Sequence, residues 1–105
     1  MFDAQMEFRK GILFIRLTGE LNNKTINDFR MKVKEVVIRA GIRYLVLNVN
    51  NLNSVTNEGV KEIKSLKKVM KKLDGEFYLF GGSIKKLKGL VNLENELNVF
   101  ERVVI

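Results

Sequence analysis

One nearly continuous apolar segment constrains the fold of this chain more than any other feature. The run Tyr44-Leu45-Val46-Leu47-Asn48-Val49 is interrupted only by Asn48. Such a run is typical of a central strand that is covered on at least one face and lies parallel to a neighbour. A Gly-containing turn precedes it, at Ala40-Gly41, and a polar segment follows it. The sequence therefore predicts an α/β fold built around this strand.

The segments on either side alternate between strand and helix patterns. Period-two alternation predicts a first strand, and apolar spacing typical of helices predicts two longer helices. Thr25 is expected to cap the first of these helices, with Asp28 in a capping-box-like arrangement. The expected elements are strands at 2–8, 12–17, 43–49, 76–80 and 99–104, and helices at 26–39, 57–73 and 84–93. This β-β-α-β-α-β-α-β order predicts one domain, residues 1–105, with a mixed four- to five-stranded sheet covered by about three helices.

The composition excludes several kinds of chemistry. The chain has no Cys and no His, which rules out disulfides, thiolate metal sites and His-based acid–base or triad catalysis. The spacing of Glu20, Glu58, Glu62 and Glu76 marks no catalytic carboxylate pair. We therefore expect a binding protein without a cofactor or a metal, not an enzyme. Because no signal peptide or long apolar run is present, we also expect a soluble, unprocessed cytoplasmic chain with no membrane association.

Positive charge is concentrated on the second long helix. The net charge of the chain is +7, and residues 61–72 hold six lysines and one acid, Glu62, so that segment carries +5. The lysines are Lys61, Lys64, Lys67, Lys68, Lys71 and Lys72. They indicate either a solvated helix face or a surface for an acidic protein or a nucleic acid, the latter with help from Lys85, Lys86 and Lys88.

The polar segment after the central strand is the candidate site. It runs from Asn53 to Gly59 and leads into the lysine-rich helix, whose first N–H groups and positive dipole end need a cap. Thr56 or Asn57 suits that role. Turns from a buried strand into a helix are also where α/β proteins often bind partners. Gly81-Gly82-Ser83, by contrast, matches no phosphate-binding fingerprint, although a nucleotide-responsive domain using Gly81–Ser83 remains a third interpretation.

Three segments give the chain a family resemblance. Arg16-Leu17-Thr18-Gly19-Glu20-Leu21, Ile42-Arg43-Tyr44-Leu45-Val46-Leu47-Asn48 and Thr56-Asn57-Glu58-Gly59-Val60, with Asn51-Leu52 before the last, resemble segments of the STAS domain of bacterial anti-sigma factor antagonists. The resemblance extends over residues 5–104. It implies the STAS fold and a role in transcription regulation, in sporulation or stress signalling. The implied partner is an anti-sigma factor that is also a serine kinase, whose binding frees a sigma factor.

The resemblance also implies which residues bind. In the family the turn reads Asp-Ser-Ser/Thr-Gly-Leu, and phosphorylation of its first Ser ends binding. Asn57 stands at that position here, so the switch cannot operate there, and Thr56 and Ser54 are the nearby hydroxyls. The expected partner-binding residues are Asn22, Asn23, Lys24, Ser54, Thr56, Asn57, Glu58, Gly59, Lys61 and Lys64.

Other departures accompany the loss of the serine. Thr56 replaces an Asp, Asn22 falls where many members have Asp, and the sequence ends at Ile105 without a further helix that is common in the family. An incompletely covered sheet favours partner binding or self-association, and we expect a monomer or a weak dimer. The alternative function is a small basic nucleic-acid-binding domain that uses the helix at residues 61–72.

Overall fold

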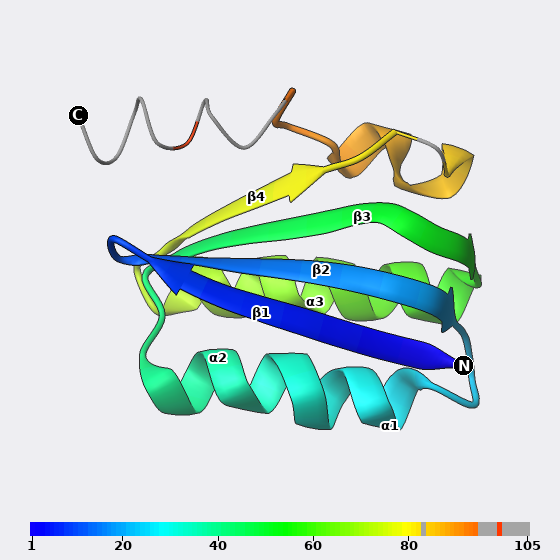
Figure 1. Cartoon of the computed structure of the whole chain (residues 1–105), viewed down its shortest axis with the longest axis horizontal. Coiled ribbons are helices and arrows are strands. Elements are labelled where there is room, and N and C mark those ends of the chain that lie inside the picture. The colour runs from blue at the N-terminus through cyan, green and yellow to red at the C-terminus, as the bar shows by residue number, and fades with distance from the viewer. Residues whose placement is uncertain (83, 95–98, 100–105) are drawn as a thin grey trace.

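The computed structural model describes residues 1–82, 84–94 and 99. Its centre is a four-stranded sheet in which the strands lie in chain order, β1-β2-β3-β4 (Figure 1). β1 is antiparallel to β2, whereas β2, β3 and β4 are mutually parallel. The strands are β1 (Phe2–Arg9), β2 (Ile12–Leu21), β3 (Tyr44–Val55) and β4 (Glu76–Phe80). The predicted mixed α/β sheet with a parallel central strand is confirmed.

Helices connect the parallel strands, as right-handed crossovers between them require. Between β2 and β3 the helix is continuous but is divided into α1 (Ile26–Phe29), a π-helical turn η1 (Arg30–Lys34) and α2 (Glu35–Ala40). It ends at Gly41, whose φ of 65° gives a left-handed cap, at the turn that the sequence places there. α3 (Asn57–Lys72) joins β3 to β4, and a short 3₁₀ helix, η2 (Lys85–Leu90), follows β4.

Both faces of the sheet are covered by apolar side chains. On one face the α1–η1–α2 helix and α3 lie side by side against the sheet (Figure 1). Alternate strand residues point to this larger core, among them Ile15, Leu47 and Leu79. A smaller cluster on the other face comprises Ile12, Phe14, Val46, Tyr78, Leu93 and Val99. The near-continuous apolar run of β3 therefore reflects a strand that is covered on both faces.

Two strands are longer than the sequence predicts. β2 continues to Leu21 and β3 to Val55, through segments that were expected to be loops. The extensions pair with each other, Leu21 opposite Val55, with irregularities in the register between Arg16 and Thr18 and between Gly19 and Glu20. Strand pairing satisfies the backbone hydrogen-bonding groups of these polar segments, which local propensity alone assigns to turns. As a result, the candidate site begins at strand ends and not in a long loop.

The first strand is only partly buried. Phe2 is buried and Ala4 half-buried, but Met6 and Phe8, which the alternation places on the same face, are exposed. The tight turn at Lys10 and Gly11, with φ of 51° and 86°, closes the β1–β2 hairpin.

Predictions near the C-terminus have mixed outcomes. The expected helix at 84–93 is the shorter η2. The strand expected at 99–104 lies outside the described residues, apart from Val99, which is helical and buried. Among the helices of the described residues, none combines the length and the apolar character that crossing a membrane requires.

Candidate protein-binding site

Parallel pairing brings two distant segments together at one end of the sheet. Because β2 and β3 run in the same direction, the segment after Leu21 emerges beside the segment after Val55. The backbone N–H of Thr56 donates to the carbonyl oxygen of Leu21 at 3.0 Å, which fixes the two chain segments to each other. The Asn22–Lys24 loop thus lies next to the start of α3, as the candidate site requires.

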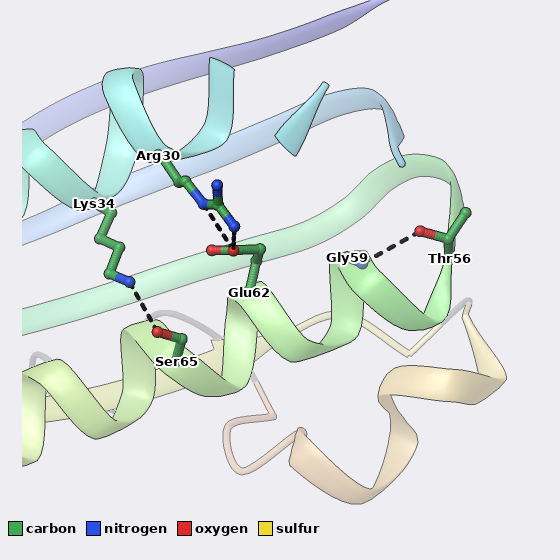
Figure 2. Close-up of polar contacts among 6 residues, drawn as sticks. All are labelled: Arg30, Lys34, Thr56, Gly59, Glu62 and Ser65. Carbon is green, nitrogen blue, oxygen red and sulfur yellow. Dashed lines mark hydrogen bonds and ion pairs between the residues drawn. The ribbon is translucent and has the colours of Figure 1, made fainter. Parts of the chain in front are cut away.

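The start of α3 is a capped helix N-terminus that presents polar side chains. Thr56 is extended, with φ −84° and ψ 170°, and its Oγ1 accepts a hydrogen bond from the N–H of Gly59 at 3.2 Å (Figure 2). Of the two residues suited to capping, Thr56 therefore caps. Asn57 and Glu58 follow, both exposed, and the carboxylate of Glu58 in the first turn complements the helix dipole.

Gly59 packs closely against the ends of β2 and β3. The residue is buried. A Cβ atom at this position would lie 2.7 Å from Val55 Cγ2 and 2.8 Å from the carbonyl oxygen of Leu21. The close approach that glycine allows is thus between α3 and the ends of β2 and β3.

The loop after β2 is held by its own hydrogen bonds. Thr25, expected to cap the first helix, makes no side-chain hydrogen bond to that helix. Its Oγ1 instead donates to the carbonyl oxygen of Glu20 at 2.8 Å and accepts from the N–H of Asn22 at 2.9 Å. Asn22 Oδ1 accepts from the N–H of Lys24 at 2.9 Å. Asn22 is accordingly half-buried and shapes the loop, whereas Asn23 and Lys24 are exposed.

The remaining candidate residues are accessible side chains around the same helix start. Ser54 is exposed at the end of β3, and Lys61 and Lys64 are exposed on α3. The other four lysines of α3 are exposed as well. In the part of the chain that the structure describes, no ion pair neutralises any of these lysines. The helix therefore presents unneutralised positive charge beside the polar turn.

One polar contact between helices was not anticipated from the sequence. Arg30 Nε donates to Glu62 Oε1 at 2.8 Å, and the second guanidinium nitrogen bonds the same oxygen (Figure 2). Glu62 is 8% exposed, and its carboxylate raises the pKa of Arg30 through the hydrogen bond and the charge interaction. Lys34 Nζ donates to Ser65 Oγ at 2.8 Å one turn further along. These two contacts join η1 to α3 and hold α3 in place.

The burial of Glu62 has a signal in the sequence, but its partner does not. Glu62 lies three residues after Gly59 and four before Leu66, on the buried side of α3. That spacing marks the carboxylate as enclosed and in need of a cation. Arg30 is 32 positions away in the chain, and only the packing of the two helices brings it into reach.

The first residue of the glycine pair after β4 packs against a neighbouring strand. Gly81 is buried, and a Cβ there would lie 2.8 Å from the backbone nitrogen of Asn50. Its close approach is therefore to β3. Ser83 lies outside the described residues. Within the described residues, no group of three or more Asp or Glu side chains is placed to hold a metal ion.

Comparison with known proteins identifies related sequences. The STAS domain family model matches residues 3–103. The anti-sigma F factor antagonist of Paenibacillus polymyxa is 32% identical over 72 residues, which are 69% of this chain and 62% of that protein. The matched region thus spans less than two thirds of this relative.

Solved structures share the fold. An anti-sigma factor antagonist from Mycobacterium paratuberculosis superposes with a TM-score of 0.81 and 18% identity, covering 100% of this chain and 96% of that one. The unphosphorylated form of the anti-sigma factor antagonist SpoIIAA gives a TM-score of 0.76, also with 18% identity, covering 97% and 98%. At this identity the likeness establishes a common fold, and it agrees with the resemblance of the three sequence segments.

Proposed function

The chain belongs to the STAS domain family, and we propose that it acts as an anti-sigma factor antagonist, a regulatory binding protein and not an enzyme. The single observation that carries the proposal is the convergence of the Asn22–Lys24 loop and the start of α3. Both segments are fixed from within, by Thr25 and by Thr56, and both present exposed polar groups. A prearranged polar surface binds with little loss of conformational entropy.

In this proposal the partner is an anti-sigma factor that is also a serine kinase. Asn57 and Glu58 offer an amide and a carboxylate to it, and Ser54, Asn23 and Lys24 flank them. Lys61 and Lys64 complement an acidic patch on the partner, which chiefly accelerates and orients association. Formation of the complex frees the sigma factor.

Asn57 makes the chain insensitive to the usual switch. It is the first residue of α3, directly after the cap, and its amide has no hydroxyl to phosphorylate. A phosphate there would add about −1.5 to −2 units of charge to the contact surface. Of the nearby hydroxyls, Thr56 is engaged as the cap and half-buried, while Ser54 is exposed at the end of β3. We therefore expect binding that persists in ATP.

Calorimetric titration against the anti-sigma kinase of the same organism tests this function. The wild-type chain is expected to bind with ADP and, after prolonged incubation with ATP, to bind equally well and to gain no mass. Asn57→Ser restores a hydroxyl at the first position of α3. It should gain one phosphoryl group in ATP and then lose affinity.

Asn57→Ala is the matched control, since it removes the amide without supplying a hydroxyl, and it should gain no mass. Failure of every variant to bind in either nucleotide would overturn the antagonist function. A mass increase on the wild-type chain would instead locate a phosphosite elsewhere, with Ser54→Ala and Thr56→Val as the variants that assign it.

The exposed lysines of α3 favour a second candidate, a small nucleic-acid-binding domain. None is neutralised by an ion pair within the described residues, and Lys85, Lys86 and Lys88 are exposed on η2. This function requires binding to DNA or RNA that weakens steeply as salt rises. Unchanged electrophoretic mobility of a nucleic acid with excess protein at low salt would eliminate it.

A further inference from the structure

The sheet ends at β1, and the outer edge of β1 has no neighbouring strand within the described residues. The N–H of Glu20 donates to the carbonyl oxygen of Met1 at 2.8 Å. Hydrogen-bonded pairs alternate along an antiparallel ladder, so the odd-numbered residues of β1 bond to β2. The backbone N–H and C=O groups of Ala4, Met6 and Phe8 therefore point away from β2, toward the open edge.

Apolar side chains lie along this edge. Met6 is 37% exposed and Phe8 is 61% exposed, although the β2 residues opposite them, Ile15 and Leu13, are buried. An open edge flanked by exposed apolar groups is a template for another strand, and natural proteins usually protect it. Here the even-numbered positions of β1 carry neither lysine nor proline, the residues that commonly block such pairing.

The sequence of β1 is complementary to itself in one register. Pairing two copies about a two-fold axis at Met6 aligns residues 3–9 of the two strands and sets Asp3 of each copy opposite Arg9 of the other. On the helix-covered face, Ala4 then lies opposite Phe8, so a small side chain faces a large one.

Neighbouring registers are less favourable. A change of register keeps every side chain on its own face of the sheet only if the two-fold axis moves by a whole residue. The nearest such registers have the axis at Gln5 or at Glu7. With the axis at Gln5, Asp3 lies opposite Glu7. With the axis at Glu7, that carboxylate lies opposite its own copy. Like charges placed directly opposite each other destabilise a strand pair, and larger shifts shorten the overlap.

We propose that the outer edge of β1 binds a second copy of this chain, antiparallel and with the two-fold axis at Met6, so that one sheet runs through both copies. Arg9 keeps its contact with Glu7 at 3.3 Å and gains Asp3 of the second copy. One strand pair is at the small end of specific interfaces, so the dimer is expected to dissociate on dilution.

The proposal is independent of the anti-sigma function. The candidate protein-binding site lies at the Leu21 end of β2 and the hairpin turn at the other end. Antiparallel pairing therefore directs the two sites of a dimer to opposite ends, and neither belongs to the interface.

Cysteine cross-linking tests the register, since the chain contains no cysteine. Residues opposite each other in a hydrogen-bonded antiparallel pair have Cα atoms about 5.5 Å apart, within the range that a disulfide spans. Met6→Cys should therefore form a disulfide-linked dimer on mild oxidation. Met31→Cys, a methionine exposed on the helix instead, is the matched control and should remain monomeric. Equal cross-linking of the two variants would overturn the proposal.

A charge exchange tests the same register in solution, by sedimentation across a range of concentrations. Asp3→Arg and Arg9→Asp each place like charges opposite each other, and each should lose the dimer that the wild-type chain forms at high concentration. The double variant restores opposite charges and should regain the dimer. Circular dichroism verifies that each variant is folded, because Arg9 also contacts the ring of Phe14. A wild-type chain that stays monomeric at every concentration contradicts the proposal.

Discussion

The two long helices of this protein both begin at a threonine, but the two threonines do different work. Thr56 is extended and its hydroxyl caps α3. Thr25 has φ −111° and ψ −4°, and its hydroxyl turns back to bond Glu20 and Asn22. In α1 it is the carbonyl oxygen of Asn22 that accepts from the N–H groups of Thr25 and Ile26.

The difference arises from how the chain reaches each helix. β3 leads into α3 through an extended residue, so the threonine side chain points along the helix and reaches its third residue. Before α1, the chain must turn sharply at Asn22–Lys24, and the threonine holds that turn closed. The same residue type at the same helical position thus stabilises a helix in one place and a loop in the other.

Substitution of Gly59 tests how tightly the start of α3 packs against β2 and β3. It should lower the free energy of unfolding more than the other substitutions below. Alanine is ordinarily favoured over glycine inside a helix. Gly59→Ala, however, forces a methyl group against Val55 and the carbonyl oxygen of Leu21. We expect the free energy of unfolding to fall by about 3 kcal/mol, as for overpacking of a tight core. Chemical denaturation measures it.

Gly82→Ala is the control, because a Cβ at Gly82 meets nothing within 4 Å. Its stability should be close to that of the wild-type chain. If Gly59→Ala proved equally harmless, α3 would not be locked against the ends of β2 and β3.

Removal of the Thr25 hydroxyl tests whether this side chain stabilises the Asn22–Lys24 loop. Thr25 is 8% exposed, and Thr25→Val leaves the N–H of half-buried Asn22 without its acceptor. We expect a loss of about 2 kcal/mol in unfolding free energy, the range for an unsatisfied buried polar group. Faster amide hydrogen exchange at Asn22 should accompany it. Thr25→Ser keeps the hydroxyl and should recover most of the loss; a purely global effect, with no local exchange at Asn22, would speak against a loop-holding role.

Loss of the Thr56 cap should have the smallest effect. Thr56→Val keeps the branched shape but removes the acceptor for the N–H of Gly59. We expect about 1 kcal/mol of destabilisation, typical of a lost N-cap. Thr56→Ser keeps the acceptor and should retain the stability of the wild-type chain. A loss larger than that of Thr25→Val in parallel denaturation experiments would reverse the order inferred from burial.

The sequence predicted the element order as far as β4, because that order is encoded by apolar periodicity, which is local. It did not predict that β2 and β3 continue through polar residues, because those ends are stabilised by pairing with each other. The contact between Arg30 and Glu62 was not predicted for the same reason, because it depends on how two helices pack.

The candidate site divides in the same way. The exposure of Asn57 and Glu58 follows from their position at a helix start, and spacing alone predicts it. The burial of Gly59 was not predicted, because the groups that enclose it come from Leu21 and Val55. Residues that face solvent are readable from a local pattern, whereas residues that face another element require the fold.

The order of strands in the sheet has a consequence for how the protein forms. The strands lie in the order in which they occur in the chain. The β1–β2 hairpin closes over a tight turn and can form within microseconds, whereas β3 and β4 must each wait for a helix to be completed. During synthesis, each new strand therefore adds to the edge left by the one before it. The growing edge moves away from β1, and among the described residues no later strand covers the first edge to appear.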